Sequence, residues 1–212
     1  MKLMKHLPLL SLTFALSSAV ACAQYKAEPA GPPPSDLAPS IAGALEKSGT
    51  KITNNGAAYC EIWFRASKPT GGKNASEEAV TLPSIPQGAL LAVIRFDGKG
   101  ADRRGQNIKP GAYTLRYSMM PVNGDHQGAA PQRDFMLMVP ATDDKDLNAA
   151  PGFDALVDMS KKASGTPHPA VISLWKADDA KTGFSQQGDD WVIQTKLGDT
   201  PIAVILIGMA SS

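Results

Sequence analysis

Short strand-like segments at close spacing are the feature that most constrains the fold of this chain. Runs rich in β-branched and aromatic residues alternate with turns rich in glycine and proline, which is typical of antiparallel strands. The expected strands cover residues 59–67, 78–82, 89–97, 109–120, 134–140, 168–175, 189–197 and 200–208. Strands do not alternate regularly with helices, so a parallel sheet is not indicated. We expect a mainly β protein, an antiparallel β-sandwich of about eight strands, with a closed β-barrel as the alternative.

Two short helices are expected beside these strands. In residues 35–49, Leu37, Ile41 and Leu45 recur at helical spacing, with Ser35 or Asp36 as the cap. Residues 148–165 are expected to form the second helix. Residues 24–34, "QYKAEPAGPPP", are rich in proline and are expected to form an extended, mobile tether. Residues 35–212 then form a single domain of ordinary size.

The first 23 residues predict export. "MKLMKHLPLLSLTFALSSAVACA" has a basic head, a short apolar centre and small residues at its end, which is the pattern of a secretory signal peptide. Its apolar centre is shorter than the roughly 20 residues that a membrane-spanning helix needs. Cleavage after Ala23 would leave Gln24 as the new N-terminus; lipidation of Cys22 is the alternative route. We expect a periplasmic or extracellular protein, or a lipid-anchored envelope protein if Cys22 is modified.

Charge and cysteine content restrict the partners. Removal of the signal peptide takes away two of 21 basic residues and none of 20 acidic residues, so the net charge moves from +1 to −1. Nothing here favours binding to nucleic acid or to an anionic membrane. Cys22 is either removed with the signal peptide or lipidated, so Cys60 has no partner for a disulfide within the same chain. We expect Cys60 to be a buried small hydrophobic residue.

A long loop at residues 121–133 is the best candidate for contact with a ligand. Loops of about a dozen residues are often functional. The candidate contact residues in and beside it are Asp125, His126, Arg133 and Asp134, together with the distant His168. The opposing interpretation is mechanical, with these polar side chains holding an ordinary connection between two strands.

Catalytic and metal-binding patterns are weak. Two histidines and a carboxylate would suit zinc if His126 and His168 converged, but the spacing of a blue-copper site is missing. No G-x-S-x-G nucleophile elbow occurs, and "GKGADRRG" lacks the order of a phosphate-binding loop. We therefore predict no cofactor and no bound metal.

Four segments resemble a family of secreted bacterial proteins of unknown function. These are "YCEIWFRASKP", the "PGAYTLRY" hairpin, the "GDHQG…RDF" loop and "HPAVISLW". The resemblance covers roughly residue 35 to the C-terminus. It implies a β-sandwich outside the cytoplasm and supplies no activity or site residue.

The leading hypothesis is a non-catalytic module that binds a small ligand or an envelope protein. A metal-dependent or hydrolytic enzyme using His126 and His168 is the alternative. A third possibility is carbohydrate binding through Trp63, Trp175 or Trp191, which would require an exposed aromatic platform; core packing is the expected role of these residues.

Overall fold

A computed structural model describes residues 24–73, 79–120 and 132–210. The helices are α1 (Pro39–Ala44) and α2 (Phe153–Ser164). The strands are β1 (Tyr25–Pro29), β2 (Thr50–Asn54), β3 (Ala57–Phe64), β4 (Leu90–Phe96), β5 (Gly100–Ala101), β6 (Asn107–Ile108), β7 (Gly111–Met119), β8 (Asp134–Pro140), β9 (Val171–Lys176), β10 (Gly183–Gln187), β11 (Asp190–Leu197) and β12 (Thr200–Ile207).

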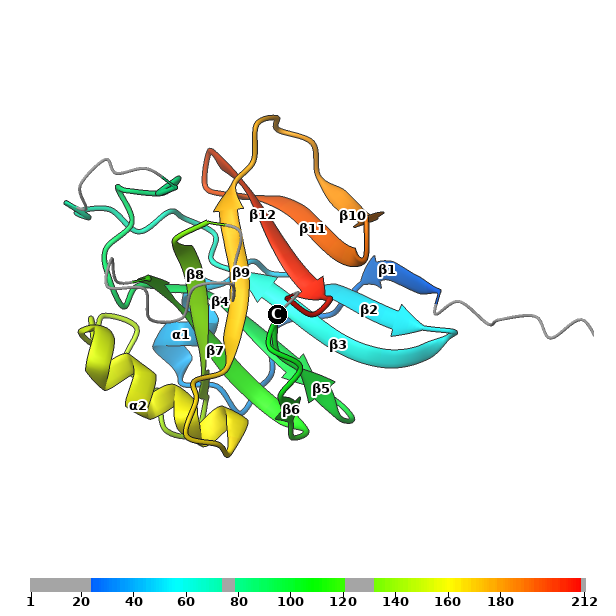
Figure 1. The fold of residues 1–212 in the computed structure, drawn as a ribbon, viewed down its shortest axis with the longest axis horizontal. Coiled ribbons are helices and arrows are strands. Elements are labelled where there is room, and N and C mark those ends of the chain that lie inside the picture. Colours follow the sequence, from blue (N-terminus) through cyan, green and yellow to red (C-terminus); the bar gives the residue numbers. More distant parts are fainter. Residues whose placement is uncertain (1–23, 74–78, 121–131, 211–212) are drawn as a thin grey trace, which may run out of the picture.

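Ten strands form one continuous antiparallel sheet in the order β1-β2-β3-β4-β7-β8-β9-β12-β11-β10. The sheet curls so that its two outer strands, β1 and β10, come near each other (Figure 1). The expected mainly β fold with two short helices is confirmed. Of the two expected architectures, the sheet approaches the barrel, because it is not divided into the two layers of a sandwich.

The barrel interior is filled by side chains that alternate along the strands. On β7, Leu115 and Tyr117 point into the main core, whereas Arg116 points to the outer face. Cys60 on β3 is buried in the same core, as expected. Burial raises the pKa of its thiol, so Cys60 stays protonated and behaves as a small hydrophobic residue.

The two helices cover the outer face of the sheet on the side of β3, β4, β7 and β8 (Figure 1). Helix α1 packs Ile41 against Trp63 and Val93. Helix α2 packs Leu156 against Leu137 and Val139 of β8. These contacts explain why β4 and β8 are largely apolar, since both faces of each strand are mostly buried; Arg95 near the end of β4 is exposed.

Helix α1 is shorter than expected. It begins at Pro39 and its N-cap is Ala38, without a side-chain hydrogen bond, so the predicted capping by Ser35 or Asp36 is wrong. It ends at Ala44, well before Gly49. Gly49 serves another purpose, because a Cβ there would lie 2.5 Å from the indole nitrogen of Trp63.

The expected tether is partly a strand. Tyr25–Pro29 pairs with Thr50–Asn54 in β2, and the backbone N–H of Asn55 donates to the carbonyl of Gln24 at 3.1 Å. Gln24, the first described residue, is thus already hydrogen-bonded to the turn after β2. A proline-rich composition did not prevent pairing, because an edge strand needs to pair along one side only.

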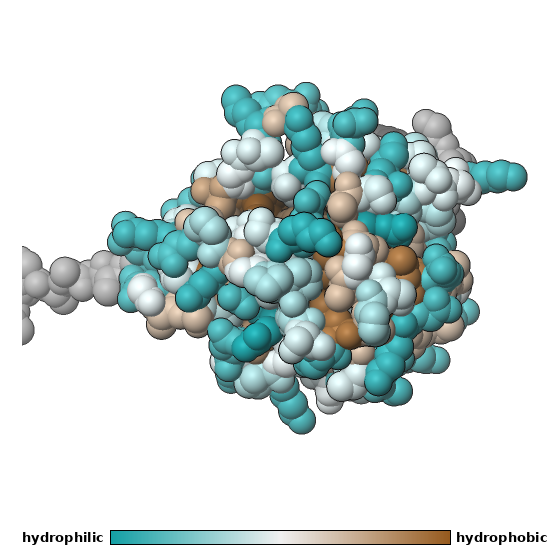
Figure 2. Space-filling view, turned by 180° about the vertical axis from the view of Figure 1, so that it is seen from behind, coloured by the Kyte–Doolittle hydropathy of each residue, from teal (hydrophilic) through white to brown (hydrophobic). Residues whose placement is uncertain are grey.

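The surface seen from behind is mostly hydrophilic, with small hydrophobic areas between polar side chains (Figure 2). Met209 is the one large hydrophobic side chain in the described part of the chain that is strongly exposed, at 72%. No described helix has the length and apolar character needed to cross a membrane.

Candidate functional site: a cleft at the barrel end

A cleft of about 590 Å³ opens at the end of the barrel where β12 finishes. Its walls are formed mainly by Tyr25 of β1, Tyr59 of β3, residues 99–103 at β5, and residues 205–209 at the end of β12. Asn107, Ile172 and Asp189 complete the lining. This volume lies within the range of about 300–1,000 Å³ that small-molecule sites occupy, and the mouths of β-barrels are common places for such sites.

One wall of the cleft is aromatic. The rings of Tyr25 and Tyr59 meet edge to face at 5.7 Å, and Tyr25 meets Trp191 in the same way at 5.4 Å. Trp191 in turn stacks on Phe184 of β10 at 5.3 Å. Tyr25 thus links β1 to β11 across the gap between the outer strands. The contacts are of the geometry that aromatic pairs prefer.

The two tyrosine hydroxyls of the cleft remain protonated at neutral pH. Burial is the largest cause that raises the pKa of Tyr59, and the nearby Cys60 raises it further. Burial also raises the pKa of Tyr25. A neutral phenol can donate a hydrogen bond, so this wall offers apolar ring faces together with polar edges.

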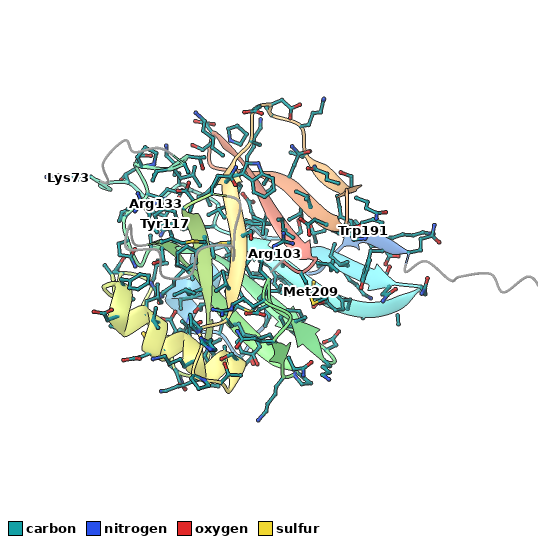
Figure 3. The ribbon with its side chains drawn as sticks, in the orientation of Figure 1. Lys73, Arg103, Tyr117, Arg133, Trp191 and Met209 are labelled. Carbon is teal, nitrogen blue, oxygen red and sulfur yellow. The ribbon has the colours of Figure 1, made fainter. Side chains whose placement is uncertain are left out.

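Arg103 is held in place beneath the C-terminal segment. Its backbone N–H donates to Val171 and its carbonyl accepts from Ala210, each at 2.8 Å. Its Nη1 forms an ion pair with Asp190 at the start of β11. The backbone of Gly208 passes close to this ion pair and has a positive φ of 139°. A Cβ at this position would overlap the Asp190 carboxylate. Figure 3 shows Arg103 and Met209 close together at this end.

The guanidinium of Arg103 keeps unused donor capacity. Its side chain is 10% exposed, and Nε is a buried donor without an acceptor among the described residues. A guanidinium has five N–H donors, and a buried donor without a partner costs roughly 1–3 kcal/mol. An acceptor brought into the cleft by a ligand would relieve this cost after a small movement of the side chain.

Asp102, although it also lines the cleft, serves the fold. Its carboxylate accepts from the backbone N–H groups of Arg104 at 3.0 Å, Gln106 at 2.8 Å and Val171 at 3.1 Å. The side-chain amide of Gln106 adds a fourth bond at 2.8 Å. Asp102 therefore fixes the turn after β5 against β9 and gives Arg103 a defined position. The segment "GKGADRRG", whose sequence is typical of a turn-rich hairpin connection, contains β5 and the turn that leads to β6.

The structure places three of the five predicted contact residues. Asp134 is fully buried and accepts from Thr81 N–H at 2.5 Å, from Leu82 N–H at 3.2 Å and from the Tyr117 hydroxyl at 2.6 Å. Arg133 donates through Nε and Nη2 to the carbonyl of Met120. Both contacts match the mechanical interpretation of the loop. Asp125 and His126, like Cys22, lie outside the described residues.

His168 does not lie beside Arg133 and Asp134. In the pairing of β8 with β9, Phe135 is opposite Ser173, which places Asp134 beside Leu174. His168 lies six residues before Leu174, ahead of the start of β9 at Val171. His168 is exposed, and its hydrogen bonds with Ser164 and Thr166 use its backbone groups. Arg133 and Tyr117 lie together, away from Met209 and the cleft (Figure 3).

Neither a metal centre nor an aromatic platform stands out in the part of the chain that the structure describes. No group of three or more His, Cys, Asp or Glu side chains is placed there to hold a metal ion. Trp63 is buried and donates from its indole nitrogen to Gly31 at 2.9 Å. Trp175 and Trp191 are half-buried. None of the three tryptophans is therefore an exposed platform.

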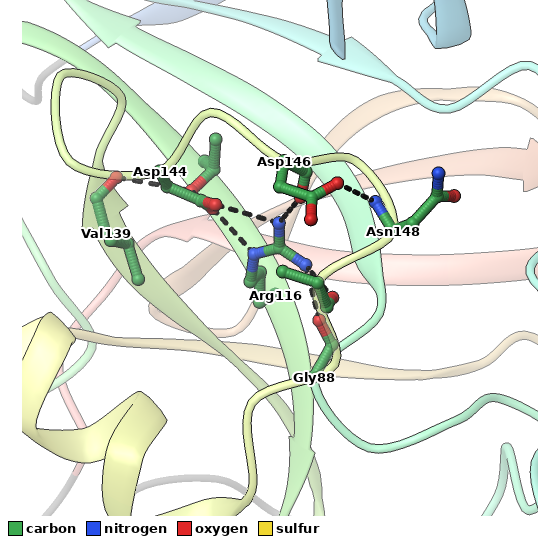
Figure 4. A network of polar contacts seen from close by, with 8 residues as sticks. Gly88, Arg116, Val139, Asp144, Asp146 and Asn148 are labelled. Atoms are coloured by element: carbon green, nitrogen blue, oxygen red, sulfur yellow. Dashed lines mark hydrogen bonds and ion pairs between the residues drawn. The ribbon is translucent and has the colours of Figure 1, made fainter. Parts of the chain in front are cut away.

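A second buried arginine, Arg116, is fully occupied (Figure 4). It forms a two-point ion pair with Asp144, with Nε–Oδ2 at 2.6 Å and Nη2–Oδ1 at 2.8 Å. Its other donors reach the carbonyls of Gly88, Asp146 and Ala149. All five N–H groups are used, so Arg116 ties the loop before β4 to the connection between β8 and α2.

Comparisons with family models, with curated proteins and with solved structures find no match to this chain. The functional argument therefore depends on the geometry of the cleft. Sequence reasoning missed its residues, because Tyr25 lies in the expected tether and Arg103 in the expected turn-rich connection. The cleft forms only when residues 99–103 and 205–209 meet in the fold.

Proposed function

We propose that this protein is an exported, non-catalytic binding protein that holds a small ligand in the cleft at the barrel end. The ligand has an apolar or aromatic body and an anionic or other hydrogen-bond-accepting group. The cleft carries this proposal, because an aromatic wall and an arginine whose Nε has no acceptor among the described residues converge on a space of about 590 Å³. The signal-peptide pattern of the first 23 residues supports export.

The ligand would place its body against Tyr25 and Tyr59 and its acceptor toward Arg103. Hydrogen bonds to charged groups contribute about 1.5–3 kcal/mol, more than neutral ones, so the acceptor would fix the ligand's orientation. The apolar wall would supply most of the buried area. Such a division between an apolar lining and a few placed polar groups is typical of small-molecule sites.

Two dyes that differ by one sulfonate test this proposal. We expect 8-anilinonaphthalene-1-sulfonate to bind more tightly than N-phenyl-1-naphthylamine, which has the same ring system without the anion. Binding is measured by the rise in dye fluorescence and by the change in emission of Trp191, which contacts the wall of the cleft. Equal affinities for the two dyes would contradict the role of Arg103.

Two sets of variants locate the binding. Ala101→Phe, which narrows the cleft, should weaken both dyes at least tenfold, whereas Ala180→Phe on an exposed loop should change neither. The double variant Arg103→Gln with Asp190→Asn neutralises the ion pair without leaving one charge alone. It should remove the preference for the sulfonate dye. Each 1.4 kcal/mol of lost preference lowers the ratio of the two affinities about tenfold. Binding that survives Ala101→Phe would place the dye elsewhere and refute the proposal.

A further inference from the structure

The gap between the two outer strands of the sheet forms a second feature of the molecule, separate from the cleft. β1 pairs with β2 and β10 with β11, but no ladder joins β1 to β10. The two strands come near each other (Figure 1), and Tyr25 of β1 meets Trp191 of β11, the strand that pairs with β10. Each of the two strands keeps one edge of backbone groups without a partner strand in the described sheet.

The two edges differ in how strongly their sequences discourage pairing with another strand. β1 has the sequence YKAEP, in which Lys26, Glu28 and Pro29 are residue types that discourage pairing with another strand. β10 has the sequence GFSQQ, which contains neither a charge nor a proline. Four of its five residues are exposed. The edge of β10 is thus the one that can accept a further strand.

A hollow of about 360 Å³ lies between the two strands. Ala27 and Pro29 line it from β1, and Phe184 and Ile193 line it from β10 and β11. Glu28 is the one charged residue in this lining, and it forms no ion pair within the described ranges 24–73, 79–120 and 132–210. A neighbouring hollow of about 330 Å³ shares Gly49, Thr50, Thr182 and Thr195 with the first.

We propose that the edge of β10 binds an extended segment of another polypeptide as an added strand. Main-chain hydrogen bonds to β10 supply affinity, and alternate side chains of the segment supply specificity. One apolar side chain of the segment fills the hollow beside Phe184. A basic side chain next to it faces Glu28. This strand occupies the gap and leaves the cleft at the barrel end open.

Peptide probes test the proposal on the whole protein by fluorescence polarisation. The first probe is a capped, dye-labelled peptide of sequence Lys-Val-Thr-Val-Thr-Val-Thr; the second carries Glu in place of Lys. We expect measurable binding of the first and roughly two- to fivefold weaker binding of the second, because exposed ion pairs contribute little. Glu28→Lys should reverse this order, and added salt should bring the two affinities together.

Backbone pairing is tested separately from side-chain contact. Two versions of the first probe carry N-methyl groups on alternate residues, each on a different edge of the peptide strand, so each loses the N–H donors of that edge. At least one of the two versions should bind about tenfold more weakly than the parent peptide. Ser185→Pro and Gln186→Pro remove consecutive N–H groups of β10, of which one points to β11 and the other to the free edge. The variant that keeps the melting temperature should lose the peptide.

Several results would overturn the proposal. These are no binding of the first probe, equal binding of both N-methylated versions and the parent, or no change with Glu28→Lys. A concentration-dependent dimer that the folded proline variant abolishes would assign the edge to a second copy of this chain instead. Ala101→Phe is the control, since it narrows the cleft and should leave peptide binding unchanged.

Discussion

Replacing Asp144 by Asn should destabilise the protein severely, although the two side chains have nearly the same shape. Arg116 is fully buried and Asp144 is its one carboxylate partner among the described residues. Asn removes the negative charge and turns an N–H₂ group toward the guanidinium in place of an oxygen. A buried ion pair that loses one partner costs about 3–5 kcal/mol, because the remaining charge is left uncompensated. The Thr114 hydroxyl, 2.5 Å from Asp144 Oδ2, loses a charged acceptor as well.

This loss is measured as the difference in free energy of unfolding in urea, by circular dichroism. The adjacent residue supplies the control, because Asp143 forms an exposed ion pair with Lys162 at 2.8 Å. Asp143→Asn makes the same chemical change one position away in a solvated pair, and we expect no measurable change in stability.

An apolar replacement of both partners refines the test. Arg116→Met with Asp144→Leu removes both charges, which relieves the uncompensated cation. It also leaves the carbonyls of Gly88, Asp146 and Ala149 without their donor, so stability should recover only in part. A cost below about 1 kcal/mol for Asp144→Asn would show that Arg116 does not depend on this carboxylate and would refute the argument.

Three further predictions follow from other buried groups. Asp134→Asn should lower the free energy of unfolding in urea by about 2–4 kcal/mol, because the donors of Thr81, Leu82 and Tyr117 lose a charged acceptor. His168 is exposed, so His168→Ala should change this free energy by less than about 0.5 kcal/mol. Burial raises the pKa of Cys60 and Tyr59 in the folded state, so the unfolded chain releases these protons first as the pH rises above about 9. The free energy of unfolding measured by urea titration should therefore fall in this pH range. The double variant Cys60→Ala with Tyr59→Phe should make this fall with pH less steep. Gly208→Ala should lower the melting temperature measured by calorimetry, since a Cβ meets the Asp190 carboxylate, whereas Gly98→Ala, with open space around it, should not; equal melting temperatures would contradict the close crossing.

The apolar strands were predictable from the sequence, because their signal is local. The expected strand 134–140 coincides with β8, and the hairpin expected at Gly198 joins β11 to β12. The strand expected at residues 78–82 is wrong in its described part, 79–82. The backbone N–H groups of Thr81 and Leu82 donate to the Asp134 carboxylate rather than to a neighbouring strand. Hydrogen bonds to a side chain 52 or 53 residues away thus take the place of the strand pairing that the apolar pattern predicted.

The polar strands and the cleft could not be predicted in this way. β1 and β10 are mostly exposed, so they carry no alternation of apolar and polar residues. They form because β2 and β11 offer free edges to pair with. The alternation along β7 places Arg116 opposite the core, which suggests solvent; the connection after β8 covers it instead and brings Asp144.

The two arginines show how an arginine that holds the fold differs from one that offers a site. Arg116 and Arg103 are both largely buried and both pair with an aspartate. In the first, five hydrogen bonds use every donor, so no ligand can gain by approaching it. In the second, the pair uses Nη1 and leaves Nε without an acceptor in the described chain, beside an open cleft. Because no described residue accepts a hydrogen bond from Nε of Arg103, a ligand that supplied an acceptor would gain free energy at Arg103 that it could not gain at Arg116.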